Sequence, residues 1–214
     1  MWLIWDIIMI TRAQLAITLS KLEGFTNPNP AREQYMTDSE IASQMLWNAF
    51  MLGDIKDKIV ADLGAGTGAL GLGALLLEAK WVIFVEIDPA ALEAARRNYE
   101  KLRAQFGLGN NVTFINSDIG LYSKEVDTVI ENPPFGVQNE HADRPFLLKA
   151  FEIGKIVHSL HKIESQGFIE GIAKESGFHV SHVWRYSMPL KKTMEFHTHR
   201  IERVAVGCFR LAKS

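Results

Sequence analysis

The sequence predicts a single α/β domain around a mostly parallel, seven-stranded sheet, with helices on both faces and an antiparallel hairpin at its C-terminal end. Three observations support this fold class. Short apolar runs of the buried-strand type alternate with helix-like segments from residue 58 onward, a pattern typical of parallel strands joined by right-handed crossovers. A glycine-rich turn follows the first of these runs. The last two β-rich runs have no helix-like segment between them.

The composition fits one globular domain in a reducing compartment. The chain has 214 residues, of which 47% are hydrophobic, and its net charge is -2. A chain of this length can bury roughly 70% of its unfolded surface. The single cysteine, Cys208, excludes an internal disulfide and a cysteine zinc site. We therefore expect a cytoplasmic protein whose overall charge gives no sign of a nucleic-acid partner.

The first ten residues, MWLIWDIIMI, are apolar but predict no membrane segment. A helix needs about 20 such residues to span a bilayer. The segment also contains Asp6 and lacks the basic start and small-residue cleavage site of a signal peptide. We expect a helix extension on the body of the protein or a translation start placed too early, with Met9 as the alternative start.

Two helices are expected before the sheet begins. Apolar residues at helical spacing predict a helix over 11–23, which Gly24 and the Asn-Pro-Asn-Pro stretch at 27–30 would end. A second helix is expected over 37–50, with Thr37-x-x-Glu40 as its capping box. Residues 1–50 would form a helical segment that contributes a lid, and residues 51–214 the main domain.

The remaining elements follow from alternating apolar runs and helical patterns. The expected strands are 59–63, 81–86, 112–116, 126–131 and 155–160, and the expected helices are 69–78, 88–104, 145–154 and 164–176. The runs 179–186 and 201–211 are expected to pair antiparallel at the sheet edge.

The turn after the first strand reads Asp62-Leu63-Gly64-Ala65-Gly66-Thr67-Gly68. Glycines there allow a tight turn and a close approach of the backbone to a ligand. Read as Gly64-x-Gly66-x-x-Ala69, the turn passes for a dinucleotide fingerprint, which is a weak signal. Read from Asp62, it resembles the glycine motif of class I S-adenosyl-L-methionine-dependent methyltransferases, in which the acid engages the amino-acid end of the cofactor.

Two further acids follow strands and support a nucleoside ligand. Glu86 ends the second strand, where a carboxylate can accept hydrogen bonds from ribose hydroxyls. Asp118 follows the third strand and could accept from an adenine amino group, while Ile119 offers a backbone amide to a ring nitrogen. The alternative for Asp118 is a helix or turn cap.

The most informative stretch is Asn132-Pro133-Pro134-Phe135, directly after the fourth strand. It resembles the motif of methyltransferases that act on planar nitrogens. The Asn132 side-chain oxygen and the Pro133 carbonyl can both accept hydrogens from an exocyclic amine and align its nitrogen with a methyl donor. The prolines fix the backbone, and Phe135 offers a face on which a base can stack.

Beyond these motifs, the chain resembles the methyltransferase-like protein five family and its archaeal relatives over residues 20–210. The segments that carry the resemblance are 21–25, 33–37, 127–130, 132–136, 159–162 and 195–197. It implies a class I, Rossmann-like enzyme that methylates adenine N6 in small-subunit ribosomal RNA with S-adenosyl-L-methionine. It also implies a small zinc-binding activator protein that pairs with the sheet edge.

The resemblance further implies which residues meet the cofactor. Gln34 and Thr37 would cover it, Gly64, Gly66 and Thr67 would form its turn, and Glu86, Asp118 and Ile119 would hold its nucleoside. Met36 stands where the family commonly has proline, and Thr67 where some relatives have cysteine.

Several features stay open at this stage. Residues 141–214 hold 12 basic and 7 acidic side chains and all seven histidines, so this third could present a positive surface to RNA. Trp184, Arg185, Lys191 and Lys192 are RNA contacts or ordinary core and surface residues. His158 and His161 are expected to be held by packing or to lie near RNA phosphate, and His197-x-His199 is not expected to bind metal. Residues 136–145 are a substrate lid or a plain surface loop, and strand 112–116 would accept a partner strand if it lies at the edge.

Three alternative functions remain at this stage. A guanine N2 amine or a glutamine amide could replace adenine as the acceptor. An NAD-dependent oxidoreductase would follow if the glycine turn is read as a dinucleotide fingerprint. A non-catalytic scaffold would keep the fold without the reaction.

Overall fold

The computed structural model describes residues 10–29, 33–135, 142–190 and 202–214. The helices are α1 (Arg12–Leu19), α2 (Ser39–Met51), α3 (Ala69–Leu76), α4 (Pro89–Phe106), α5 (Arg144–Ile153) and α6 (Gln166–Glu175). Two short 3-10 turns are η2 (Ile119–Leu121) and η3 (Ile163–Ser165). The strands are β1 (Ile59–Leu63), β2 (Trp81–Glu86), β3 (Val112–Asn116), β4 (Val126–Glu131), β5 (Gly154–Lys162), β6 (Phe178–Leu190) and β7 (Glu202–Lys213).

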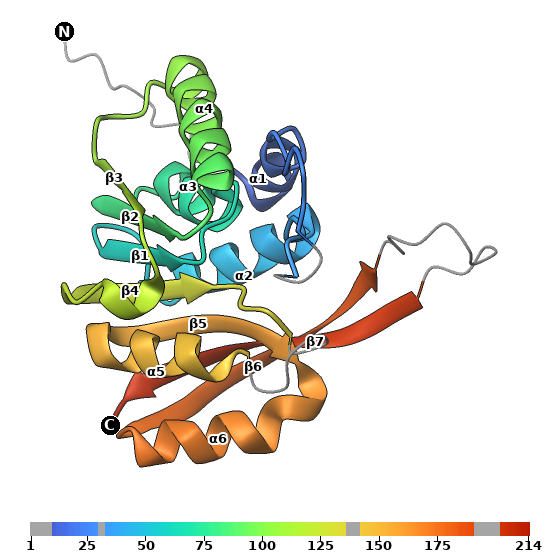
Figure 1. Cartoon of the computed structure of the whole chain (residues 1–214), viewed down its shortest axis with the longest axis vertical. Coiled ribbons are helices and arrows are strands. Elements are labelled where there is room, and N and C mark those ends of the chain that lie inside the picture. The colour runs from blue at the N-terminus through green and yellow to red at the C-terminus, as the bar shows by residue number, and fades with distance from the viewer. Residues whose placement is uncertain (1–9, 30–32, 136–141, 191–201) are drawn as a thin grey trace, which may run out of the picture.

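The described strands form one sheet in the order β3-β2-β1-β4-β5-β7-β6 (Figure 1). The pairs from β3 to β5 are parallel, and β7 runs antiparallel to both β5 and β6. This arrangement confirms the expected mixed sheet with an antiparallel C-terminal end. The order reverses between β1 and β4, the place where ligands bind in open α/β sheets.

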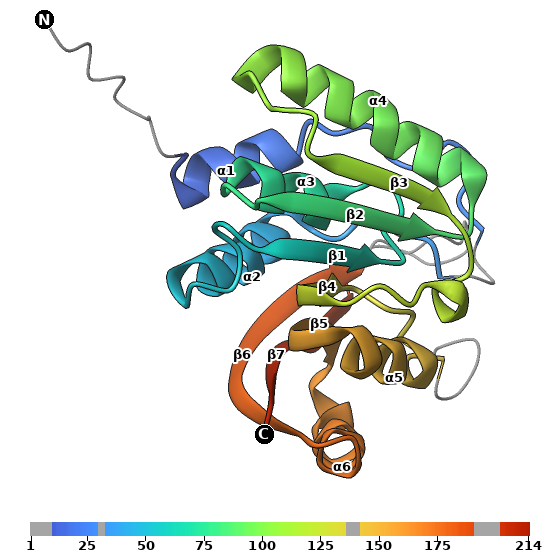
Figure 2. The ribbon, with the colours of Figure 1, turned by 90° about the vertical axis from the view of Figure 1, so that its left-hand side faces the viewer.

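Helices cover both faces of the sheet. One hydrophobic core joins α1, α2, α3 and α4 to one face, and a second joins α5 and α6 to the other. Neighbouring residues on β1 serve opposite cores, Val60 the first and Ala61 the second. The parallel strands point toward the segment that joins α1 to α2 (Figure 2).

The N-terminal helices differ from the expected ones in extent and capping. Helix α1 ends at Leu19 rather than near residue 23. The proposed capping box of Thr37 and Glu40 is wrong, because Asp38 caps α2 and its carboxylate accepts hydrogen bonds from the amides of Glu40 and Ile41. The Thr37 hydroxyl is free for another contact, described below.

Some expectations lie outside the described residues. These concern residues 1–9, the loop 136–141, Lys191 and Lys192, and His197 and His199. Within the described part of the chain, no helix is long and apolar enough to cross a membrane.

Candidate functional site

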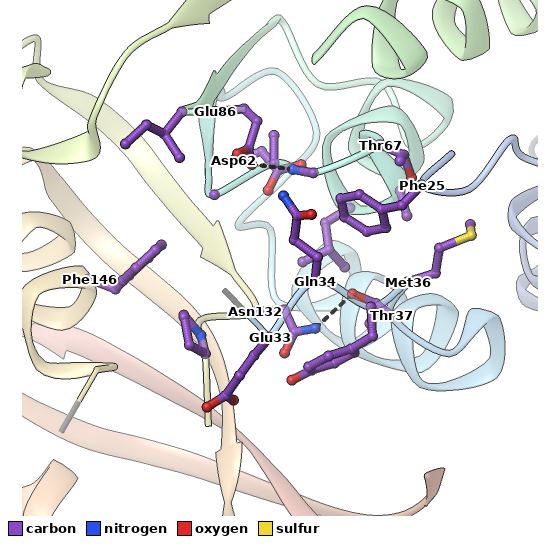
Figure 3. Close-up of a pocket in the computed structure, with 18 of the residues that line it drawn as sticks. Phe25, Glu33, Gln34, Met36, Thr37, Asp62, Thr67, Glu86, Asn132 and Phe146 are labelled. Atoms are coloured by element: carbon purple, nitrogen blue, oxygen red, sulfur yellow. Dashed lines mark hydrogen bonds between the residues drawn. The ribbon is translucent and has the colours of Figure 1, made fainter. Parts of the chain in front are cut away.

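A cavity of about 330 Å³ lies beside the glycine turn, at the carboxyl ends of β1, β2 and β4 (Figure 3). Its walls come from the segment between α1 and α2, the turn after β1, and the loops after β2, β3 and β4. The lining residues with predicted roles are Gln34, Thr37, Asp62, Gly64, Gly66, Thr67, Glu86, Asp118, Ile119, Asn132 and Pro134. The structure therefore brings together all the predicted cofactor residues, whereas Pro133 and Phe135 do not line this cavity.

The backbone of the glycine turn has a conformation in which residues other than glycine would be strained. Gly64 and Gly66 have φ angles of 66° and 53°, in the left-handed region. A Cβ on Gly64 would lie 2.8 Å from Phe146, and one on Gly66 would lie 2.9 Å from Phe25. The turn thus needs glycine for its conformation and for the close approach of two aromatic rings.

Asp62 lies at the end of β1 and is almost completely buried. Its Oδ2 accepts a hydrogen bond from the Gly71 amide at 2.8 Å. Burial raises the pKa of its carboxyl to about 7 against the opposing Gly71 hydrogen bond, and the nearby charge of Glu86 adds to the rise. A carboxyl that ionises near neutral pH in a cavity is suited to bind a cationic group there.

Glu86 holds the turn in place from the end of β2. Its two carboxylate oxygens accept hydrogen bonds from the amides of Gly66 at 2.7 Å and Asp88 at 2.9 Å. Each carboxylate oxygen has a second lone pair, so these contacts leave acceptor capacity toward the cavity.

Asp118 caps a short turn, as the alternative predicted, and it also lines the cavity. Its Oδ1 accepts a hydrogen bond from the Gly120 amide at 2.7 Å and starts η2. The side chain is exposed, which leaves its other oxygen able to meet a ligand. Both expectations for this residue are therefore compatible.

Residues 33–37 turn alternate side chains toward different walls of the site. Gln34 Nε2 donates to Asp88 Oδ2 at 2.7 Å, beside the loop after β2. Met36 reaches the other way, with its sulfur 2.8 Å from the position of a Cβ on Gly24. The other three residues face the loop after β4.

Asn132 is held by Thr37 and keeps one atom unsatisfied. Its Nδ2 donates to the Thr37 hydroxyl at 2.9 Å (Figure 3). Its Oδ1 is buried and has no hydrogen-bond partner among the described residues. Buried polar atoms are rarely left unpaired, and those that are often belong to a functional site. This oxygen is a ready acceptor for a donor that enters the cavity.

Glu33 and Tyr35 support the same loop. Glu33 Oε2 accepts a hydrogen bond from the Phe135 amide at 2.6 Å, and the Tyr35 ring lies 5.7 Å from the Phe135 ring. Burial, aided by the charge of Glu33, raises the pKa of the Tyr35 hydroxyl, and the side chain of Asn132 opposes the rise. The sequence analysis included Glu33 and Tyr35 in the segment that carries the resemblance but gave neither a role, because their partner lies about a hundred residues away.

The two central histidines are buried rather than near RNA phosphate. His158 is 0% exposed and hydrogen-bonds Asp54 at 2.8 Å, while His161 is 1% exposed and lies between Ser159 and Asp143. Trp184 is half-buried and packs against the first core. Both histidines are therefore held inside the protein by buried hydrogen bonds.

Comparison with known proteins finds methyltransferases that are similar over most of the chain. Residues 36–153 match the family model described as methyltransferase small domain. The rRNA N(6)-adenosine-methyltransferase METTL5 of Danio rerio is 32% identical over 206 residues, covering 92% of this chain and 96% of that protein.

Two solved structures share the architecture. PH1948 from Pyrococcus horikoshii is 45% identical with a TM-score of 0.85, covering 94% of this chain and 98% of that one. The magnesium protoporphyrin IX methyltransferase ChlM from Synechocystis, with bound SAM, has a TM-score of 0.61 at 16% identity, covering 92% and 90%. The second likeness concerns the fold alone.

Proposed function

Because the chain belongs to the methyltransferase small domain family, and within it to the METTL5 proteins, we propose that it methylates N6 of an adenosine in small-subunit ribosomal RNA. The observation that carries the proposal is the buried Asn132 Oδ1, which lacks a partner in the described part of the chain. The relative from Danio rerio, which acts on rRNA adenosine, supports the choice of acceptor.

The cavity fits S-adenosyl-L-methionine, the cofactor of this methyltransferase. Its glycine turn lines the cavity with backbone, and its two buried acids, Asp62 and Glu86, can meet an ammonium group and ribose hydroxyls. We assign Asp118 and Ile119 to the adenine end and Gln34 and Thr37 to the cover, with the segment 1–50 as a lid on the domain 51–214. When bound, the cofactor supplies an electrophilic methyl group on a sulfonium.

The chain's own residues would hold the substrate amine. An adenine amine is a weak nucleophile because its lone pair is delocalised into the ring. Asn132 Oδ1 accepts one of its hydrogens, and the Pro133 carbonyl accepts the other, so that the nitrogen is aligned for transfer. Phe135, held through its amide by Glu33, offers a stacking face. No strong general base is needed, because the nitrogen that has accepted a methyl group carries the positive charge and then readily releases its extra proton to water.

Labelled methyl transfer to purified small-subunit rRNA, followed by nucleoside analysis, tests the acceptor. We expect label on N6-methyladenosine, and a loss of at least about 100-fold in Asn132→Ala. Asn48→Ala is the matched control, because Asn48, on α2, donates a hydrogen bond to Tyr186 on β6 and does not line the cavity. Label on guanosine or on protein would replace adenine as the substrate, and preferential binding of NAD over S-adenosylhomocysteine would point to an oxidoreductase.

The proposed activator protein has a suitable place to bind. Strand β3 is at one edge of the sheet, and an edge strand can accept a partner strand by backbone hydrogen bonding. We propose that a small zinc-binding protein pairs there, in the cytoplasm. Hydrogen exchange tests this: β3 amides should become protected when the partner is added, while β6, the opposite edge, should not.

A further inference from the structure

Four buried polar side chains form a continuous hydrogen-bonded chain on the α5 face of the sheet. Glu131 Oε1 lies 2.8 Å from Ser159 Oγ, Ser159 Oγ lies 2.6 Å from His161 Nε2, and His161 Nδ1 lies 3.0 Å from Asp143 Oδ2. All four residues are at most 7% exposed. Ser159, His161 and Asp143 are hydrogen-bonded in the same sequence of residue types as a serine hydrolase triad. Their burial, however, keeps an ester substrate from reaching the serine.

These hydrogen bonds link the residue before Asn132 to the residue before α5. Glu131 is the last residue of β4 and directly precedes Asn132, while Asp143 directly precedes α5. Glu131 pairs with Ser159 in the register of β4 and β5, and His161 lies two residues further along the same face of β5. Glu131 and Asp143 are thus joined through two side chains of β5.

The hydrogens that these four side chains must share show that their hydrogen bonds depend on one mobile proton. His161 Nδ1 faces the Asp143 carboxylate, so it must carry a hydrogen. The single Ser159 hydrogen can then point to His161, which requires a protonated Glu131 as donor to Ser159. It can instead point to Glu131, which requires a doubly protonated His161. Both arrangements contain the same number of protons, and they differ by the transfer of one proton through Ser159.

We propose that this four-residue relay shares one proton and positions Asn132 for methyl transfer, an inference that rests on the proposed function of the loop. When the proton is lost, Ser159 cannot donate to both neighbours. One link then becomes a contact between two acceptors, which must move apart. Since Glu131 is joined to Asn132 through the backbone, this movement displaces the acceptor oxygen. A displacement of about 1 Å in a reacting group can lower a rate about 100-fold.

The surroundings of Glu131 favour the arrangement with the proton on its carboxyl. Its side chain is 0% exposed, and its Oε2 has no partner within the described residues. Burial raises the pKa of Glu131 to about 8 against the opposing Ser159 hydrogen bond, and the carboxylates of Asp143 and Asp62 add to the rise. The groups placed against it are Asp62 on β1, Ser159 and His161 on β5, and Asp143 before α5. At neutral pH the relay therefore holds its proton, and it loses that proton as the pH rises through about 8.

The pH profile of kcat at saturating cofactor tests the relay. We expect wild-type kcat to fall as the pH rises through about 8. Glu131→Gln cannot ionise, and its amide can still donate to Ser159, so this variant should keep neutral-pH activity and lack the alkaline fall. Ser159→Ala should lose about tenfold or more of kcat at every pH. Glu170→Gln and Ser165→Ala, on or before α6 and away from the relay, serve as matched controls.

Infrared spectroscopy gives a readout that does not depend on activity. The difference spectrum between wild type and Glu131→Gln should contain a protonated carboxyl band at neutral pH, which disappears above about 8. A missing band, or an alkaline fall that persists unchanged in Glu131→Gln, would overturn the relay. If the wild-type protein transfers no methyl group to adenosine while the band is present, the proposed function fails and proton sharing in the relay stands.

Discussion

The Asn132 amide nitrogen donates a hydrogen bond to the Thr37 hydroxyl at 2.9 Å, between two segments that are 95 residues apart in sequence. In this arrangement the amide turns its nitrogen toward Thr37. Because the nitrogen is engaged, Oδ1 is the atom that remains for a substrate amine. Thr37 therefore orients the proposed acceptor in addition to lining the cofactor cavity.

Replacing Thr37 should separate these two roles. Thr37→Val retains the size of the side chain but removes the acceptor for the Asn132 amide. A net loss of about 1 kcal/mol in orientation corresponds to a fall in kcat of about fivefold to tenfold. Thr37→Ser keeps the hydroxyl and should behave like the wild type. Equal kcat values for the two variants at saturating cofactor would show that the contact does not orient Asn132.

Glu33 should act on kcat through the backbone of the same loop. Its carboxylate accepts from the Phe135 amide at 2.6 Å, and hydrogen bonds to charged groups contribute about 1.5–3 kcal/mol. We expect Glu33→Ala to lower kcat about 10- to 100-fold, with little change in cofactor affinity by calorimetry. The kcat of Glu33→Gln, which retains a neutral acceptor oxygen, should lie between those of the wild type and Glu33→Ala. A variant with weak cofactor binding and normal kcat would place Glu33 in the cofactor site instead.

Strand positions could be predicted almost to the residue, and helix boundaries less well. Each of β1 to β4 coincides with an apolar run bounded by turn residues, because a strand buried on both faces must be apolar throughout. The predicted start of α2 was wrong because Thr37 and Asp38 are both residue types that commonly cap the N-terminus of a helix. Only the tertiary contact of Thr37 with Asn132 decides between them.

The site could be predicted where its residues lie next to a motif. Asp62 is the last residue but one of β1, Glu86 ends β2 and Asn132 follows β4. All three lie at the same edge of the parallel strands, so their convergence follows from the topology. Glu33 and the relay could not be predicted, since their partners are far apart in sequence. Ser159 was noticed only as part of a family resemblance. His161 was expected to be held by packing or to lie near RNA phosphate, and Asp143 was only part of the stretch 136–145 considered as a substrate lid or a surface loop.

Asp62 should make cofactor binding pH-dependent. The pKa of its carboxyl is raised from an ordinary 3.8 to about 7, so it becomes charged, and able to attract an ammonium group, as the pH rises through about 7. Calorimetry with S-adenosyl-L-methionine should show binding that tightens severalfold between about pH 6 and 8. Asp62→Asn should show no such trend, and an identical trend in both proteins would assign it to another group.

The raised pKa of Asp62 also affects the stability of the fold, and there a rise in pH is unfavourable. Between the ordinary and the raised pKa, native Asp62 holds a proton that the unfolded chain has lost. The free energy of unfolding therefore falls as the pH rises from about 4 to 7. Asp62→Asn should show a smaller fall over this range in denaturant titrations, with the remainder due to other buried carboxyls such as Glu131.

Two glycines offer a matched pair of alanine substitutions. Gly64 has a φ of 66°, and a Cβ there would press against Phe146 at 2.8 Å. Gly64→Ala should cost about 1–2 kcal/mol from backbone strain alone. Gly171 lies within α6, and a Cβ there would meet no described atom within 4 Å, so Gly171→Ala should stabilise by about 0.5–1 kcal/mol. Urea titrations measure both, and a stabilising Gly64→Ala would contradict the geometry of the turn.

Asp54 should be a major source of stability outside the candidate site. The side chain is 6% exposed and accepts two hydrogen bonds from Arg210, at 2.7 and 2.9 Å, and one from His158. Asp54→Asn would leave the guanidinium without its charge partner in a mostly buried position. Breaking a buried pair in this way costs about 3–5 kcal/mol. The exposed pair of Arg12 and Glu40 is the control, and Glu40→Gln should cost less than about 1 kcal/mol.

The cost of Asp54→Asn should depend on pH in a defined direction. Burial alone would raise the pKa of Asp54, but the hydrogen bonds and charges of Arg210 and His158 outweigh burial and lower it. A carboxyl with a lowered pKa stabilises the native state above its unfolded value of about 3.8, and this contribution is lost as the pH falls through the lowered value. The gap in unfolding free energy between wild type and Asp54→Asn should therefore be widest near neutral pH and narrow in acid. A gap that stays constant down to low pH would mean that packing around Asp54, and not its charge, provides the stability.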